Sequence, residues 1–280
     1  MTKPIIAIMY DFDKTLCTRD MQEYTFIPSV GMEPHEFWNH TAEVAAEETM
    51  DSILTYLYCM VEKANQSGNP LTRESLVACG KDIEYFPGVE DWFERINRYA
   101  EEAGVQVEHY VLSSGLKEII EGTSIAKYFK RIYACEFLYK DGRAYWPKMA
   151  VNYTNKTQFV YRINKGVLDI NNDIDLNRSR PDSEKRVFFS NMIYIGDGLT
   201  DVPCMKLVKQ SGGHSIAIYH KGQSHKTLPL LKHERVDWMF EADYRQGSEL
   251  DNTMKLLLEN LAYYNKLKGL NEQQKREYSE

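Results

Sequence analysis

Short apolar segments alternate with longer amphipathic segments along most of the chain, and this alternation limits the possible folds more than any other feature. The clearest apolar segment is residues 4–10, PIIAIMY, a continuous run that ends at Asp11. Unbroken runs of this kind are typical of parallel strands that are buried on both faces. Similar runs predict further strands at residues 106–112, 131–137, 187–195, 215–219 and 236–240.

The segments between these strands have the apolar spacing of helices. Helices are predicted at residues 88–103, 116–129, 156–164, 200–210 and 248–268, the last followed by a frayed polar tail. A hairpin is predicted at residues 137–146, and the polar stretch 168–184 is interpreted as a loop. Because no two-residue turn joins the main strands, the sequence favours an α/β fold with a parallel sheet covered by helices on both faces.

Residues 17–86 depart from this alternation. Three helical segments are expected there, at residues 33–48, 50–65 and 71–81, separated by glycine and proline. We interpret 17–86 as a helical domain that is inserted after the first strand. The α/β core is then formed by residues 1–16 and 87–280.

Composition and charge exclude several classes of function. The 280-residue chain carries 41 acidic and 34 basic residues, a net charge of −7, which argues against a nucleic-acid partner but not against a small phosphate ester. The five cysteines form no C-x-x-C pair, so we expect free thiols in a reducing compartment. No apolar segment is long enough for a signal-peptide core or a membrane span. We expect a soluble cytoplasmic protein without a membrane partner.

Carboxylates follow two of the predicted strands. Asp11 and Asp13 come after the first strand, and Asp197 and Asp201 follow a later one. The carboxyl ends of parallel strands meet at one edge of a sheet, so these side chains are expected to share a crevice. There one aspartate can attack and another can exchange protons, or they can jointly hold a cation. Oxygen ligands without His or Cys suit Mg²⁺, although either pair alone is also compatible with an ordinary strand-end turn.

A hydroxyl follows the strand at residues 106–112. Ser113 and the glycine after Ser114 offer a hydroxyl and backbone N–H groups that can bind phosphate oxygens. A serine hydrolase built from these serines and His109 is a poor interpretation, because the chain lacks G-x-S-x-G.

Together these motifs resemble the haloacid dehalogenase (HAD) superfamily. The D-x-D-x-T motif corresponds to residues 11–15, DFDKT; the strand that ends in Ser or Thr corresponds to residues 111–113; and G-D-G-x-x-D corresponds to residues 196–201. The resemblance implies a Rossmann-like core of residues 4–16 and 87–220. Residues 17–86 then occupy the place of the C1 helical cap of the phosphoserine-phosphatase-like branch.

The resemblance also implies catalytic roles. Asp11 is expected to attack phosphorus and form an aspartyl-phosphate, while Asp13 protonates the leaving group and then activates water. Mg²⁺ is expected at Asp11, Asp197 and the backbone carbonyl of Asp13. As a cap, residues 17–86 would close over Asp11 and contact the leaving group through side chains such as Asp20, Tyr24 or Phe26.

Ser113, Ser114 and a lysine are expected to bind the phosphate, and Asp201 to orient that lysine or a metal-bound water. Lys156 opens a predicted helix and is our choice for the lysine, with Lys148 as the alternative. The gap from Lys156 to Asp197 is longer than is usual in the family, and the 168–184 loop can absorb it.

The resemblance therefore implies a Mg²⁺-dependent phosphatase that acts on a small phosphorylated metabolite. Dehalogenases and P-type ATPases lack an acid at the place of Asp13, which favours phosphatase chemistry. A phosphomutase, another phosphotransferase and a non-catalytic HAD-fold binding protein are the alternatives. Asp20 stands where the branch often has Glu, so the resemblance does not extend to phosphoserine as the substrate.

Overall fold

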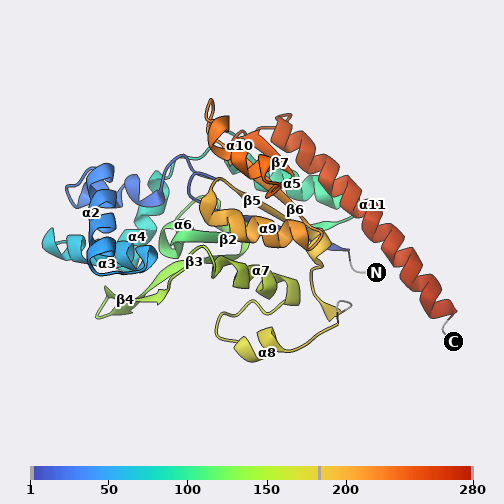
Figure 1. Ribbon diagram of the computed structural model, residues 1–280, viewed down its shortest axis with the longest axis horizontal. Helices are drawn as coiled ribbons and strands as arrows, with labels where there is room; N and C mark the ends of the chain where they lie inside the picture. Colours follow the sequence, from blue (N-terminus) through green and yellow to red (C-terminus); the bar gives the residue numbers. More distant parts are fainter. Residues whose placement is uncertain (1–2, 182–183, 279–280) are drawn as a thin grey trace.

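The computed structural model describes residues 3–181 and 184–278 and contains one seven-stranded sheet (Figure 1). The strands lie in the order β4-β3-β2-β1-β5-β6-β7 and are parallel except for β4, which pairs with β3 as an antiparallel hairpin. Their bounds are β1 Ile5–Tyr10, β2 Gln106–Leu116, β3 Phe129–Lys140, β4 Arg143–Met149, β5 Met192–Gly196, β6 His214–Tyr219 and β7 Trp238–Glu241. The prediction of an α/β fold with a parallel sheet is confirmed.

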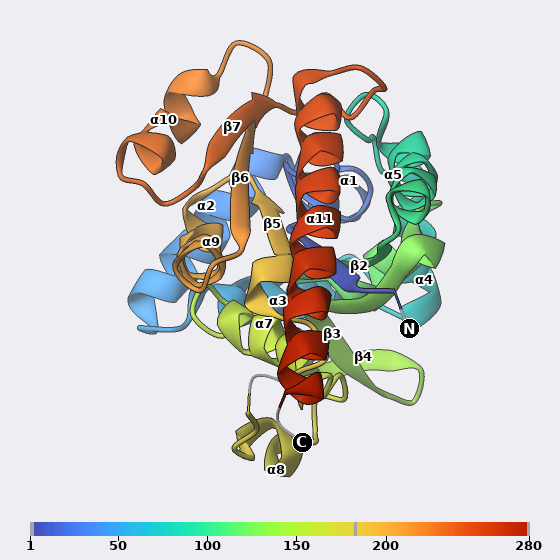
Figure 2. The same cartoon turned by 90° about the vertical axis from the view of Figure 1, so that its right-hand side faces the viewer.

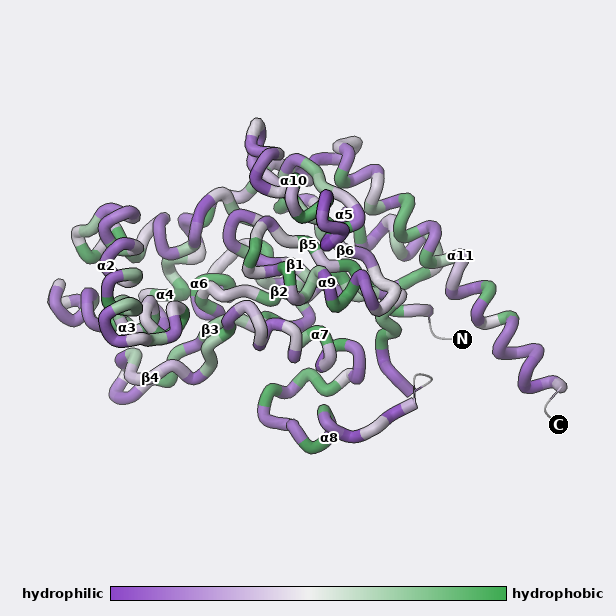
Figure 3. The backbone as a smooth tube through the Cα atoms, in the orientation of Figure 1, coloured by the Kyte–Doolittle hydropathy of each residue, from purple (hydrophilic) through white to green (hydrophobic). Residues whose placement is uncertain are grey.

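Helices cover both faces of the sheet (Figure 2). In the core, α5 and α11 pack together against one face, while α7 and α9 pack together against the other. The core helices are α5 Val89–Ala103, α6 Lys117–Glu121, α7 Lys156–Lys165, α8 Asp173–Asn177, α9 Val202–Gln210, α10 Ser224–Lys232 and α11 Glu249–Glu277. The central strands are largely hydrophobic, as expected for strands covered on both faces (Figure 3).

Residues 17–86 form a group of short helices beside the β3–β4 hairpin (Figure 1). They are α1 Phe26–Ser29, α2 Pro34–Glu47, α3 Ser52–Gln66 and α4 Arg73–Cys79, preceded by the 3₁₀ turn Met21–Glu23. The N–H of Ala144 on β4 donates to the carbonyl of Leu71 at 2.8 Å, which ties the hairpin to this group. The division of the chain into a core of 1–16 and 87–280 and a separate domain of 17–86 stays a prediction.

Several predicted elements have different bounds in the structure. The strand expected at residues 187–195 begins only at Met192, because residues 189–191 form a 3₁₀ turn. The strand expected to end at Leu112 continues to Leu116, with a register shift against β3 between these two residues. The helix expected at 116–129 is reduced to α6 and a 3₁₀ turn, Ala126–Tyr128. The Thr123 hydroxyl donates to the carbonyl of Ile120 at 2.6 Å and so satisfies an acceptor at the helix end.

The C-terminal half holds helices that the sequence did not predict. The 168–184 stretch contains α8, and the fully buried Arg162 donates to the carbonyls of Asp169 and Ile170, each at 2.7 Å. α10 was not predicted, and α11 continues to Glu277 instead of fraying after residue 268. The projecting part of α11 alternates between hydrophilic and hydrophobic residues (Figures 1 and 3). No helix within residues 3–181 and 184–278 has the length and apolar character to cross a lipid bilayer.

Close contact between α4 and the end of α6 predicts that alanine substitutions at two glycines change the stability of the protein in opposite directions. A Cβ on Gly122 would lie 1.8 Å from the carbonyl oxygen of Val77, so Gly122→Ala should lower the free energy of unfolding by roughly 1–3 kcal/mol. Gly269 lies on α11 with open space around it, so Gly269→Ala should raise that free energy by about 0.5–1 kcal/mol. Urea unfolding of both variants measures the contrast, and equal effects would contradict the packing described here.

Candidate active site

The order of the strands brings the predicted motifs to one edge of the sheet. β1 lies between β2 and β5, so the residue after β1, Asp11, is flanked by the end of β2 and by the loop after β5. The N–H of Asp11 donates to the carbonyl of Ile195 at 2.9 Å and extends the pairing of β1 with β5 by one residue. Backbone pairing between β1 and β5 therefore fixes the position of Asp11 at the edge of the sheet.

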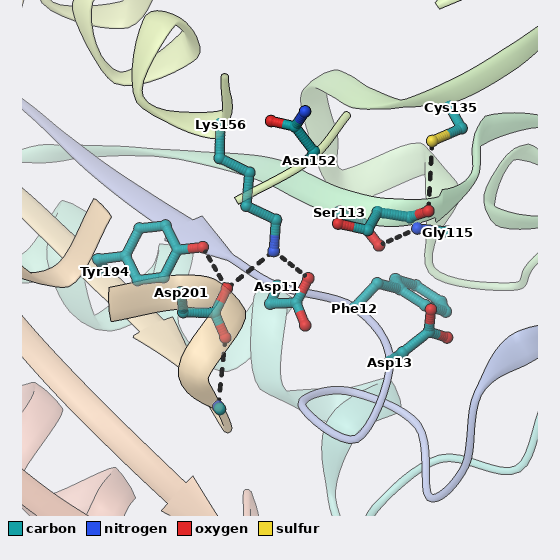
Figure 4. A network of polar contacts seen from close by, with 12 residues as sticks. Asp11, Phe12, Asp13, Ser113, Gly115, Cys135, Asn152, Lys156, Tyr194 and Asp201 are labelled. Carbon is teal, nitrogen blue, oxygen red and sulfur yellow. Dashed lines mark hydrogen bonds and ion pairs between the residues drawn. The ribbon is translucent and has the colours of Figure 1, made fainter. Parts of the chain in front are cut away.

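Lys156 connects the first and last motifs (Figure 4). Its Nζ lies 2.9 Å from Asp11 Oδ1 and 2.8 Å from Asp201 Oδ1, and its side chain is fully buried. Burial alone would lower the pKa of Lys156, but the charges of Asp11 and Asp201 outweigh it and raise the pKa. The ammonium group is therefore held in its charged form between the two carboxylates.

Asp201 is oriented by several donors. Besides Lys156, the hydroxyl of Tyr194 donates to Asp201 Oδ1 at 2.7 Å, and the N–H of Gly198 lies 3.4 Å from Oδ2. A Cβ on Gly196 would lie 2.4 Å from that Oδ2, so a glycine is needed for the carboxylate to approach the strand end. These contacts fit Asp201 as the residue that positions Lys156.

The surroundings of Asp11 shift the pKa of its carboxyl group. Burial, together with the negative charge of Asp201, raises the pKa of Asp11 to about 7, although Lys156 acts to lower it. The oxygen that Lys156 binds is Oδ1, which leaves Oδ2 for a reacting atom or a cation.

Asp13 lies in a buried and acidic environment. Its Oδ1 accepts the N–H of Met21 at 2.8 Å, and its pKa is raised well above the usual range by burial and by the charges of Asp20 and Asp11. A Cβ on Gly115 would lie 2.7 Å from Asp13 Oδ2, so this glycine makes room for the carboxyl group. Asp13 thus keeps a proton at higher pH than an exposed aspartate does, as a general acid requires.

The two serines differ in surroundings. Ser113 is fully buried, and its Oγ accepts the N–H of Gly115 at 3.0 Å. The carbonyl of Ser114 accepts the Tyr56 hydroxyl from α3 at 2.7 Å, and its own Oγ is buried without a hydrogen-bond partner among the described residues. Lys148, the alternative lysine, is half-exposed and pairs with Glu136 at 2.8 Å, outside the network around Asp11.

The edge of the sheet can accommodate a divalent cation. Carboxylate oxygens of Asp11, Asp197 and Asp201 lie within 4.8 Å of one another. No donor within the described ranges contacts the Asp197 carboxylate, and burial together with the charges of Asp201 and Asp11 raises the pKa of Asp197 to about 8. An oxygen-only set with an unpartnered carboxylate fits Mg²⁺. The carboxylate of Asp13 is not part of this group.

Some contacts at this site were not predicted. Tyr194 was not singled out, although a tyrosine inside a buried strand needs a partner for its hydroxyl, and that requirement was the available signal. The contact of Tyr56 with Ser114 joins residues 58 apart in the chain, and that of Met21 with Asp13 joins residues 8 apart. No local pattern marks either contact.

Comparison with known proteins identifies the family. Residues 8–206 match the haloacid dehalogenase-like hydrolases, and the chain belongs to this family. A protein from Borreliella burgdorferi, described as uncharacterized, is 28% identical over 276 residues, which cover 89% of this chain and 94% of that protein.

Solved structures with the same fold include a phospho-aspartyl intermediate analogue of phosphoserine phosphatase. It has a TM-score of 0.56 and 18% identity, and the match covers 91% of this chain and 99% of that one. A HAD family hydrolase from Salmonella enterica serovar Typhi gives a TM-score of 0.57 with 15% identity, covering 91% of this chain and 72% of that one. The fold is therefore that of the phosphoserine-phosphatase-like HAD proteins.

The raised pKa of Asp197 predicts a pH-dependent stability of the metal-free protein. An acid with a folded-state pKa of about 8 keeps a proton that the unfolded chain loses near its ordinary value of 3.8, so rising pH favours unfolding across that window. Between about pH 5 and pH 8, wild type should lose at least about 1 kcal/mol more stability than Asp197→Asn.

Urea unfolding in chelator across this pH range measures the difference. Asp141→Asn, at an exposed position in the β3–β4 turn, is the control and should follow wild type. The same pH profile in wild type and Asp197→Asn would contradict the prediction.

Proposed function

We propose that this protein is a Mg²⁺-dependent phosphatase that hydrolyses a small phosphate monoester through an aspartyl-phosphate at Asp11. The observation that carries the proposal is the buried Lys156, paired with both Asp11 and Asp201 at the edge of the sheet. A fixed ammonium group beside a carboxylate lowers the repulsion that an incoming phosphate would otherwise meet.

In the first step, an oxygen of Asp11 attacks phosphorus and the bond from phosphorus to the ester oxygen breaks. Because Lys156 binds Oδ1, Oδ2 is the oxygen available for attack. Asp13 donates its proton to the departing alkoxide, which leaves as an alcohol. The raised pKa of Asp13 supports this role, since the acid must still be protonated near neutral pH.

In the second step, Asp13 takes a proton from water, and the oxygen of that water attacks the phosphorus of the acyl phosphate. The bond from phosphorus to Asp11 breaks, inorganic phosphate leaves and the Asp11 carboxylate is restored. Ser113 and Lys156 would contact the non-bridging oxygens in both steps. When bound by Asp11, Asp197 and the backbone carbonyl of Asp13, Mg²⁺ supplies positive charge that offsets the charge of the phosphoryl group.

Residues 17–86 would serve as the cap of this site. They already contact the catalytic loops, because the N–H of Met21 reaches Asp13 and the Tyr56 hydroxyl reaches the carbonyl of Ser114. A cap in this place would exclude water during attack and admit it for the second step.

The substrate class that we propose is a small phosphorylated metabolite. The location that we propose for the protein is the cytoplasm. The five cysteines are free and buried, which supports a reducing compartment.

Chelation tests the role of the metal. Hydrolysis of p-nitrophenyl phosphate should fall at least about 100-fold in excess EDTA and return with added Mg²⁺, because the carboxylates would otherwise repel the phosphate. Ca²⁺ should inhibit, since its higher and looser coordination misplaces the attacking oxygen. Full activity in excess EDTA would overturn the metal dependence.

Two isosteric substitutions separate the roles of the aspartates. Asp11→Asn removes the attacking oxygen and should abolish turnover of every ester. Asp13→Asn should reduce hydrolysis of alkyl phosphates by roughly 10²–10⁴-fold and slow the attack on p-nitrophenyl phosphate less, because that leaving group needs no proton. The difference is measured as kcat/KM, which reports the steps up to release of the alcohol and excludes the later hydrolysis that also needs Asp13. Near-normal rates of both variants on an alkyl phosphate would refute the assignment.

A further inference from the structure

A cavity adjoins the candidate active site. It has a volume of about 230 Å³ and lies between the loop after β1, the end of β6 and the first turns of α10. Figure 2 shows α10 beside β6 and β7. The lining of the cavity includes Lys14, Thr18, Asp197, His220, Gln223 and Lys226. Asp197 also belongs to the carboxylate group with Asp11, so the cavity opens next to the reacting centre.

Two lysines, Lys14 and Lys226, line the cavity together with the carboxylate of Asp197. Lys14 forms an ion pair with Asp20 at 2.5 Å, while Lys226 has no ion-pair or hydrogen-bond partner among the side chains of the described residues. Burial lowers the pKa of His220, and the charges of Lys226 and Lys14 lower it further, which indicates that the three groups lie close together. The ring of His220 is held edge-on against Phe86, with centroids 4.7 Å apart.

Lys226 has no role in the proposed phosphoryl transfer. Lys156 is the cation paired with Asp11, and Lys226 belongs to a different wall on α10. Asp197 would be neutralised by a bound cation, which leaves the cavity with a positive charge at Lys226 and an uncharged donor at Gln223. Such a lining binds oxygen anions and disfavours ammonium groups.

We propose that this cavity binds a second anionic group of the substrate, a carboxylate or a further phosphate. The inference rests on the proposed phosphatase function and adds a substrate class, phosphate monoesters that carry another acidic group. Lys226 is the specificity-determining residue, and it acts on the non-reacting end of the molecule.

The test compares matched esters that differ by one anionic group. 3-Phosphoglycerate is paired with glycerol 3-phosphate, phosphoserine with phosphoethanolamine, and fructose 1,6-bisphosphate with fructose 6-phosphate. kcat/KM is measured for each ester with wild type and Lys226→Met. The matched control is Lys221→Met, which removes an exposed lysine of the same loop region that does not line the cavity. p-Nitrophenyl phosphate carries no second anionic group, so its hydrolysis measures phosphoryl transfer alone.

Wild type should prefer the more acidic member of at least one pair by about tenfold or more, which is the size expected of one charge-assisted contact. Lys226→Met should remove most of that preference and leave p-nitrophenyl phosphate hydrolysis unchanged, whereas Lys221→Met should alter neither. Turnover of p-nitrophenyl phosphate with no such preference in any pair, or a preference unaffected by Lys226→Met, would overturn the inference and leave the phosphatase function standing. No turnover of any ester would overturn both.

Discussion

The arrangement of the candidate active site depends on one buried ammonium group, that of Lys156. Lys156 is inaccessible to solvent, and a buried ammonium group is stable only when opposite charges surround it, so its position requires both Asp11 and Asp201. Because the three residues come from the start of α7, the end of β1 and the loop after β5, the ion pairs join three distant parts of the chain. Removing one partner of such a pair typically costs about 3–5 kcal/mol. The same contacts hold Asp11 Oδ1 in place and leave its second oxygen available.

The sheet makes this arrangement possible through its strand order. Because β1 lies between β2 and β5, Ser113 and Asp197 lie on opposite sides of Asp11. Glycines then determine how closely the acids approach. Gly196 admits Asp201 and Gly115 admits Asp13, and a methyl group at either position would collide with a carboxylate oxygen. The glycines of the motifs therefore have a steric role as well as a conformational one.

Much of the fold and of the site could be predicted from local sequence, and the exceptions have a common cause. Continuous apolar runs predicted the six parallel strands, the hairpin at residues 137–146 predicted β4, and parallel pairing placed Asp11, Ser113 and Asp197 at one edge. Lys156 was chosen over Lys148 from its place at a helix start, and the structure pairs Lys156 with Asp11. In contrast, α10 contains Pro229 and has few buried residues, so its apolar pattern is weak. The role of Tyr194 and the cavity beside Lys226 depend on packing between distant segments, which no local pattern records.

The central claim is that Asp11 carries the phosphoryl group between attack and hydrolysis. The most direct test quenches wild type with acid during turnover of a phosphate ester in Mg²⁺ and then adds borohydride, which reduces an acyl phosphate to an alcohol. Peptide mass spectrometry should find homoserine at position 11, dependent on the substrate and absent from Asp11→Asn. Unmodified aspartate at position 11 in protein that is turning over substrate, or homoserine at another position, would contradict the account.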